Sequence, residues 1–291
     1  MINYLNYKLK FADGKDWIFS YSEELKPLLN NFAEILGLEK TEASNSEYKI
    51  IINEYNNENK KTEYNKDDYI EIKQGKSARV VINKKTPEFL VEINKEYIDH
   101  PEIKVINMWS LVRPISLFYC SNNGGPIHAT FAELNGKGIL IAASGGVGKS
   151  TCYERLPDYW KPLSDDMALL LKDKDKQIVG HPLPTWSDHL WLRKHSTFNS
   201  SYSVPLKAIF FLKQAEIDKV TPLSKGEACQ GIYQSLKQPL ESFFTKIRPV
   251  DKKMYFSHMF NNAANISMQI PAYNLDATLD GKFWEEIEKV I

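Results

Sequence analysis

The sequence has little cysteine, no net charge and no long apolar run. Its three cysteines, Cys120, Cys152 and Cys229, lie far apart and form no CxxC pair, which argues against a disulfide framework and against a zinc site. Lysine plus arginine equals aspartate plus glutamate at 37 each, so no global basic field exists to hold DNA or RNA. No stretch reaches about 18 uncharged apolar residues, and the N-terminus has no apolar run behind basic residues. We therefore expect a cytoplasmic protein whose partners are neither nucleic acid nor membrane.

The N-terminal part of the chain has the pattern of a small α+β domain. Apolar residues recur every three or four positions between Ser22, an N-cap candidate, and Gly37, which predicts a helix that ends at this glycine. Four β-rich runs follow and suggest a meander. These runs are residues 48–52, 69–72, 78–82 and 89–93. The Asn- and Lys-rich segment 53–66 predicts a long mobile loop, and apolar spacing then predicts a helix that ends at Pro114.

The remainder of the chain has the pattern of a larger α/β domain. HATFAEL alternates, NGKG suits a tight hairpin turn, and GILIAA is a continuous apolar strand, so two strands lead into a glycine-rich segment. Pro157 limits the next helix to a short one. Further strands are predicted within residues 162–173, 178–183 and 206–212, and a closing helix over residues 283–291. We predict an N-terminal domain of residues 1–110, a candidate for acceptor recognition, and a second domain of residues 111–291.

The glycine-rich segment has the spacing of a phosphate-binding loop. Residues 143–150, ASGGVGKS, match the Walker A pattern at every position but the first, where Ala143 replaces glycine and Gly145 is a candidate to compensate. In such a loop the backbone N–H groups point at phosphate oxygens, Lys149 neutralises the β- and γ-phosphates, and Ser150 offers its hydroxyl to Mg²⁺. The predicted ATP-binding residues are Ser144, Gly145, Gly146, Val147, Gly148, Lys149, Ser150 and Thr151. The alternative is a glycine-rich turn without a ligand.

Two aspartates follow the loop and precede an apolar strand. Asp165 and Asp166 begin sixteen residues after Lys149. A Walker B aspartate normally follows its strand, so this order argues against an ordinary GTPase or AAA-type ATPase. Phosphoryl transfer to a hydroxyl needs a carboxylate beside the acceptor and oxygen ligands for Mg²⁺. We assign Asp165 as the general base and Asp166 as the metal ligand, and the two roles are interchangeable at this stage. A solvated acidic turn is the alternative.

The segment from His128 to Ser150, together with the aspartate pair, resembles the core of HPr kinase/phosphorylase. In that family a histidine leads a hairpin into a GxSGxGKS loop, and an aspartate pair follows. The resemblance is greater to the HPr-kinase-like proteins of peptide-tailoring cassettes, namely the SynChlorMet type and the lasso-peptide precursor kinases, where segments like 204–224 recur. It covers residues 115–185 well, fades through about residue 250 and does not reach the N-terminal domain.

The resemblance implies a fold, a role for one histidine and a class of acceptor. The fold would be an HPr kinase/PEP-carboxykinase-type P-loop domain with a mixed sheet, preceded by the small α+β domain. His128 would lie near the aspartate pair and assist proton transfer, so that His128, Lys149 and Asp165 form the catalytic set. The acceptor would be a serine hydroxyl on a peptide or small protein, with a ribosomal peptide precursor as one candidate. The family's EIRG-like signature, associated with phosphorolysis, is not found here, so we do not expect the reverse reaction.

Three functions are compatible with these residues. The first is an ATP- and Mg²⁺-dependent serine kinase, with Ser150 and Asp166 as the metal ligands. The second is a nucleotide-sensing module that binds ATP without transferring phosphate. The third is a small-molecule kinase that uses the same site. The complete set of lysine, hydroxyl and two acids favours chemistry over sensing, because a sensor needs no general base.

Overall fold

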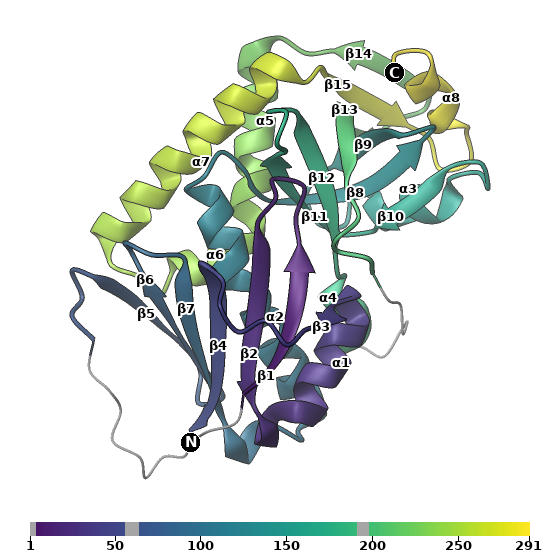
Figure 1. Ribbon diagram of the computed structural model, residues 1–291. Coiled ribbons are helices and arrows are strands. Elements are labelled where there is room, and N and C mark those ends of the chain that lie inside the picture. The colour runs from purple at the N-terminus through teal and green to yellow at the C-terminus, as the bar shows by residue number, and fades with distance from the viewer. Residues whose placement is uncertain (1–3, 56–63, 191–197) are drawn as a thin grey trace. The chain divides into compact units, whose positions relative to one another are not determined.

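The chain folds into two compact units, each with its own mixed β-sheet (Figure 1). The computed structural model describes residues 4–55, 64–190 and 198–291. The first unit contains Met1–Phe118, Trp186–Ser201 and Ser242–Lys252, and the second contains Tyr119–Thr185, Tyr202–Glu241 and Lys253–Ile291. Mixed α/β architecture was predicted from the sequence and is confirmed. Much of the segment predicted as a mobile loop, residues 53–66, lies outside the described residues.

The first unit is built on seven strands in the order β3-β1-β2-β4-β7-β6-β5. Their bounds are β1 Tyr4–Lys10, β2 Asp16–Ser22, β3 Glu39–Lys40, β4 Tyr48–Tyr55, β5 Tyr69–Gln74, β6 Ala78–Asn83 and β7 Glu88–Asn94. The four predicted strands are β4 to β7, but the predicted meander is wrong, because β4 pairs in parallel with both β2 and β7. Parallel neighbours need a crossover connection, and α1 (Lys26–Leu36) lies in the one between β2 and β4.

The predicted N-terminal helix is present and ends where the sequence indicated. A short 3-10 turn, Glu23–Leu25, leads into α1, and Gly37 follows in the left-handed conformation with φ of 67°. A Cβ at Gly37 would also lie 2.8 Å from the carbonyl oxygen of Phe198. Both the positive φ and the close backbone approach favour glycine at this position.

Helix α2 (Pro101–Cys120) is longer than predicted, because it continues through Pro114 to Cys120. Proline removes one backbone hydrogen bond and clashes with the preceding turn. The residues on either side of Pro114 are nevertheless almost all buried, and Leu111, Ile115 and Leu117 are each at most 1% exposed. Burial of this apolar surface outweighs the local cost of proline, so the expectation that the helix ends at Pro114 is wrong.

The two units are not consecutive stretches of chain, whereas the predicted domains, residues 1–110 and 111–291, follow one another. Trp186, which begins α4 (Trp186–Leu190), stacks on Phe32 of α1 with ring centroids 6.4 Å apart. Further along, the backbone N–H of Phe198 donates to the carbonyl oxygen of Ile35 at 2.7 Å. Asp251 accepts an ion pair from Lys84 at 2.8 Å. These contacts join two later segments to the first unit.

The second unit is built on an eight-stranded sheet in which β8 has a central place. Its strands are β8 Gly125–Leu134, β9 Lys137–Ala142, β10 Lys161–Ser164, β11 Met167–Lys172, β12 Ile178–Leu183, β13 Val204–Gln214, β14 Lys219–Pro222 and β15 Ala272–Ala277. Strand β8 pairs with β11 through residues 125–128 and with β9 through residues 129–134. On its other edge β9 pairs in parallel with β13, and β13 pairs in parallel with β15. The sheet is therefore mixed, as the family resemblance implied.

The side chain of Phe131 on β8 packs against glycines of two other strands in this sheet. It is fully buried. A Cβ on Gly180 of β12 would lie 2.6 Å from the Phe131 ring, and a Cβ on Gly138 of β9 would lie 3.1 Å from it. Glycine at these positions lets strands from different parts of the sheet approach one aromatic ring. Strand β9, which leads into the glycine-rich loop, therefore packs against the Phe131 ring at Gly138.

The helix after the loop is short, as predicted. Helix α3 spans Lys149–Arg155, and Pro157 follows two residues later. It packs into a core formed by β9, β13, β15 and the closing helix α8 (Phe283–Glu288), with Ile141, Phe210 and Phe283 fully buried. The remaining helices are α5 Lys225–Lys237, α6 Glu241–Phe244 and α7 Pro249–Gln269, with 3-10 turns at Lys95–Tyr97 and Gln238–Leu240. The sequence patterns predicted neither α5 nor α7.

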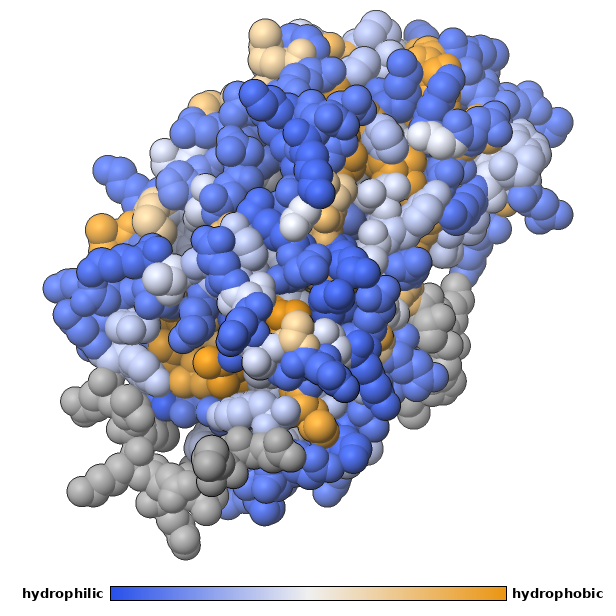
Figure 2. All heavy atoms as spheres, in the orientation of Figure 1, coloured by the Kyte–Doolittle hydropathy of each residue, from blue (hydrophilic) through white to orange (hydrophobic). Residues whose placement is uncertain are grey.

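The face of the molecule in Figure 2 is mainly hydrophilic, with several small apolar areas between the polar ones. Two of the most exposed large apolar residues are Ile217 and Leu279, at 75% and 74%. Among the helices of the described chain, none is both long and apolar enough to cross a membrane.

Candidate phosphate-binding site

The glycine-rich loop leaves β9 at Ala142 and enters α3 at Lys149. Gly146 and Gly148 have φ values of 80° and 117°, a region that residues with a Cβ rarely adopt. Ala143, which stands in place of the first glycine, is not among the described residues with positive φ. The substitution therefore requires no left-handed backbone at the first loop position, and compensation by Gly145 is not needed.

Strand β8 brings together three segments that are far apart in the sequence. Ala142, the last residue of β9, lies opposite Ala129. On the other edge of β8, Met167 of β11 lies opposite His128 and Ser164 of β10 lies opposite Phe131. The aspartate pair occupies the short gap between β10 and β11. The start of the loop and the aspartate pair consequently lie at the same level along β8, on its two edges.

Thr130 connects the aspartate pair to the lysine through the backbone. Its buried hydroxyl lies 2.9 Å from the carbonyl oxygen of Asp165 and 3.2 Å from the carbonyl oxygen of Lys149. The backbone N–H of Ala129 donates to the carbonyl oxygen of Asp166 at 3.1 Å. The sequence analysis did not select Thr130. It lies two residues after His128 on the same strand, so period-two alternation places both side chains on one face and would have indicated it.

His128 pairs with Asp166, the neighbour that the family resemblance implied. Its Nδ1 atom lies 3.2 Å from Oδ1 of Asp166 and 3.1 Å from the carbonyl oxygen of the same residue. Both neighbours are acceptors, so Nδ1 is assigned as the ring nitrogen that donates to them. Burial alone would raise the pKa of Asp166, but the hydrogen bond from His128 and the charges of His128 and Lys149 together hold it below its usual value.

Lys149 lies under the loop and is 7% exposed. Its Nζ atom donates to the carbonyl oxygens of Ala143 at 3.0 Å and Ser144 at 3.4 Å. Burial lowers the pKa of Lys149, and the charges of Asp166 and Asp165 oppose this shift without cancelling it. The ammonium group thus lies within the loop, close enough to both carboxylates for their charges to affect its pKa.

The other predicted residues lie where the loop and the first turn of α3 meet. Ser144, Gly145, Gly146, Ser150 and Thr151 are exposed, whereas Val147 and Gly148 are partly buried. Asp165 is partly buried beside Thr130 and Lys149. The structure therefore brings all predicted site residues into one region of the second unit. Their roles in binding and catalysis stay predictions.

The oxygen donors of this region suit a magnesium ion that is shared with a nucleotide. Magnesium prefers octahedral oxygen ligands and is usually held by one or two carboxylates together with substrate phosphates. Ser150 offers a hydroxyl, and the side chain of Asp166, 41% exposed, offers a carboxylate. Within the described residues no group of three or more His, Cys, Asp or Glu could hold a metal ion. Phosphate oxygens would have to complete the coordination.

The solved structures that match this chain include one enzyme structure. The Hpr(Ser) kinase/phosphatase from Coxiella burnetii is 18% identical, with a TM-score of 0.24, and the match covers 34% of this chain and 70% of that chain. Comparison with curated proteins finds no match.

A protein-family model described as SynChlorMet cassette protein ScmC matches residues 89–291. The predicted resemblance to the SynChlorMet type is thereby confirmed. The match extends further than the sequence reading expected, because it begins at β7 of the first unit and continues to the last residue. Since the model matches more than half of the chain, the protein belongs to the SynChlorMet cassette protein ScmC family.

Proposed function

We propose that the protein is an ATP- and Mg²⁺-dependent kinase that transfers the γ-phosphate to a serine hydroxyl of a peptide or small protein. The observation that carries the proposal is the convergence of a Walker A loop and an aspartate pair on β8, joined by the contacts of Thr130. A histidine paired with one of the two aspartates adds to it. This combination supplies charge neutralisation, metal ligands and a base, the three requirements of phosphoryl transfer to a hydroxyl.

Lys149 would bind the phosphates by exchanging one set of acceptors for another. It now donates to two loop carbonyls, at 3.0 and 3.4 Å, and phosphate oxygens in the loop would replace these acceptors. The lowered pKa of Lys149 reflects burial, so a negatively charged ligand beside it would be favoured. Ser150 and Asp166 would hold Mg²⁺ together with the phosphates, and the bound ion would neutralise charge on the transferred group.

Asp165 would act as general base. In this step the serine oxygen forms a bond to the γ-phosphorus, the bond from that phosphorus to the β-phosphate bridging oxygen breaks, and ADP leaves. The serine proton moves to the Asp165 carboxylate. Thr130 fixes the backbone of Asp165, and His128 fixes Asp166 in its ionised form. The backbone of Asp165 and the carboxylate of Asp166 are thus held before the substrate arrives, which would lower the reorganisation needed during the reaction.

Transfer of labelled γ-phosphate tests the proposal. The acceptor panel contains HPr, precursor peptides encoded by neighbouring genes, and free serine. We expect label on one polypeptide acceptor with the wild-type protein and a loss of about 100-fold or more with Asp165→Asn. Asp175→Asn is the matched control, because Asp175 is an exposed aspartate in the turn between β11 and β12. ATP binding without labelling of any acceptor would contradict the proposal and favour a nucleotide sensor, and label on free serine alone would favour a small-molecule kinase.

A further inference from the structure

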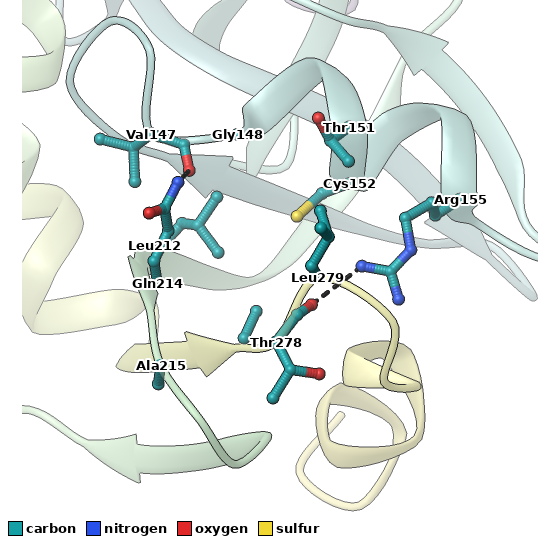
Figure 3. A pocket seen from close by; sticks show the side chains of 11 residues that line it. Val147, Gly148, Thr151, Cys152, Arg155, Leu212, Gln214, Ala215, Thr278 and Leu279 are labelled. Atoms are coloured by element: carbon teal, nitrogen blue, oxygen red, sulfur yellow. Dashed lines mark hydrogen bonds between the residues drawn. The ribbon is translucent and has the colours of Figure 1, made fainter.

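A cavity of about 280 Å³ lies beside the loop (Figure 3). It is on the side of β9 away from β8, because its lining includes residues at the end of β13. One wall is the face of α3 that carries Thr151, Cys152 and Arg155, together with Gly148 and Val147 of the loop. The opposite wall is formed by the ends of β13 and β15 and by the residues that follow them. None of His128, Asp165 and Asp166 lines this cavity.

The place of the cavity in the sheet is one where ligands bind in α/β proteins. Strands β9, β13 and β15 run parallel, and the cavity opens at their carboxyl ends. Open α/β sheets bind ligands in crevices outside the carboxyl ends of their strands. Strand β9 lies between β8 and β13, so a phosphate chain bound to the loop would have a different group of residues on each side. The charged residues of β8 and the β10–β11 gap lie on one side, and the cavity lies on the other.

The lining of the cavity is mainly apolar, with few polar groups. Val147, Leu212, Ala277 and Leu279 contribute hydrocarbon side chains, and Leu279 is 74% exposed at the rim. Burial raises the pKa of the Cys152 thiol to about 11, more than Arg155 lowers it, so the thiol is neutral and behaves as an apolar wall. A lining of this kind suits a flat, weakly polar ring system better than a phosphate or a sugar chain.

Hydrogen bonds attach both walls of the cavity to the loop and to α3. The Nε2 atom of Gln214, at the end of β13, donates to the carbonyl oxygen of Val147 at 3.1 Å. The Arg155 guanidinium donates to the carbonyl oxygen of Thr278 at 3.0 Å and to that of Gly281 (Figure 3 shows the first of these bonds). Asp218 accepts from the backbone N–H of Thr278 at 2.6 Å. The rim that follows β15 is therefore fixed in place and does not have to be ordered when a ligand binds.

We propose that this cavity is the nucleoside subsite, in which the base and ribose of ATP bind while the phosphates lie on the loop. The inference rests on the proposed function for the phosphate part of the site. With the nucleoside on the β13 side, the phosphate chain runs across the loop past Thr151 and Lys149, and its γ-phosphate ends on the β8 side. That end is where His128 and Asp166 are paired.

The experiment compares MgATP with magnesium tripolyphosphate, which has the phosphate chain but no nucleoside. Dissociation constants are measured by calorimetry with the whole chain. We expect wild-type protein to bind MgATP about 10-fold or more tightly than tripolyphosphate, because the nucleoside buries apolar surface in the cavity. Ala215→Phe places a ring in the cavity from a partly buried lining position and is expected to remove this margin, with tripolyphosphate binding changed by less than about 2-fold.

Leu279→Ser is the second variant, because an exposed residue can be replaced without loss of folding. We expect it to weaken MgATP binding by about 3-fold or more and to leave tripolyphosphate binding unchanged. Ile217→Ser is its matched control, since Ile217 is 75% exposed on the same unit and does not line the cavity. Equal effects of the two serine variants on MgATP would contradict the inference.

The outcomes separate this inference from the proposed function. Equal affinity of wild-type protein for MgATP and tripolyphosphate, or an unchanged ratio in both Ala215→Phe and Leu279→Ser, overturns the nucleoside subsite and leaves the phosphate site intact. A changed acceptor KM with an unchanged MgATP affinity also overturns it and assigns the cavity to the acceptor. Binding of neither ligand overturns both. If wild-type protein binds MgATP more tightly than tripolyphosphate and the variants remove this difference, the nucleoside subsite is supported. If the same protein labels no acceptor, the proposed kinase activity is contradicted.

Discussion

The two sides of strand β9 differ in the chemistry that they present to the loop. On the β8 side, His128, Lys149 and Asp166 form a compact polar group. Burial lowers the pKa of Lys149, and the hydrogen bond from His128 and the charges of His128 and Lys149 hold the pKa of Asp166 below its usual value against the effect of burial. On the β13 side, the cavity wall is mostly hydrocarbon, with a neutral thiol, and its polar groups bond to the backbone. One loop therefore has a side suited to reaction and a side suited to holding a weakly polar ligand. Binding and chemistry should be separable by mutation.

Among the substitutions on the β8 side, Lys149→Met is expected to have the largest effect on ligand binding and phosphate transfer. Methionine retains much of the apolar stem but removes the only ammonium group that donates to the carbonyls of Ala143 and Ser144 in the described chain. Because both MgATP and tripolyphosphate need this charge, we expect their affinities to fall together, and transfer to fall by about 100-fold or more. Lys174→Met, in the exposed turn after β11, is the control. Near wild-type transfer by Lys149→Met would contradict a role in phosphate binding.

Thr130→Val is expected to disturb the β8 side without changing any charge. Valine is close in shape to threonine but lacks the hydroxyl that lies near the carbonyl oxygens of Asp165 and Lys149. Loss of a buried donor should lower the free energy of unfolding by about 1–3 kcal/mol. Urea denaturation measures this change, and Thr221→Val, at a half-exposed position on β14, is the control. Slower transfer with an unchanged ratio of MgATP to tripolyphosphate affinity would assign Thr130 to the β8 side alone.

Substitution of His128 should give the smallest effect, a change in the titration of Asp166. His128→Leu removes the donor, so burial is no longer outweighed and the pKa of Asp166 should rise. His128→Asn retains an N–H donor, so the pKa of Asp166 should stay closer to its wild-type value than in His128→Leu. NMR titration of the Asp166 carboxyl carbon measures both variants, and an equal pKa in wild type and His128→Leu would contradict the pairing.

The same pairing fixes the sign of a stability change with pH. The folded-state pKa of Asp166 is lowered, so its contribution to stability is fully present above the unfolded pKa of about 4 and is lost as the pH falls through the lower folded value. Wild-type protein should therefore lose more of its unfolding free energy than His128→Leu when the pH falls from 6 to about 3.

The sequence predicted those parts of the site that depend on neighbouring residues. The loop, the turn of Asn135 and Gly136 between β8 and β9, and the short α3 before Pro157 follow from glycine and proline positions within about ten residues. Helix α1 was predicted to end at Gly37 for the same reason. Local stereochemistry decides these features, and tertiary contacts only reinforce them.

The features that the sequence did not predict depend on long-range contacts. Strand β2 is buried at six consecutive positions and so shows no alternation, and β4 lies between β2 and β7, which no local pattern indicates. The cavity could not be predicted either. Gln214 lies 67 residues from Val147 in the sequence, and Arg155 lies 123 residues from Thr278. Thr130 is an exception, because its alternation with His128 was available in the sequence and was not used.

One pair of variants tests most directly whether reaction and nucleoside binding occupy opposite sides of the loop. The MgATP dissociation constant and the rate of phosphate transfer are measured on the same samples of Asp165→Asn and Leu279→Ser. We predict that Asp165→Asn lowers transfer by about 100-fold or more while the dissociation constant changes by less than about 2-fold. For Leu279→Ser we predict a dissociation constant raised by about 3-fold, with kcat/KM lowered by the same factor. Parallel losses of binding and transfer in Asp165→Asn, or wild-type transfer by that variant, would contradict the account.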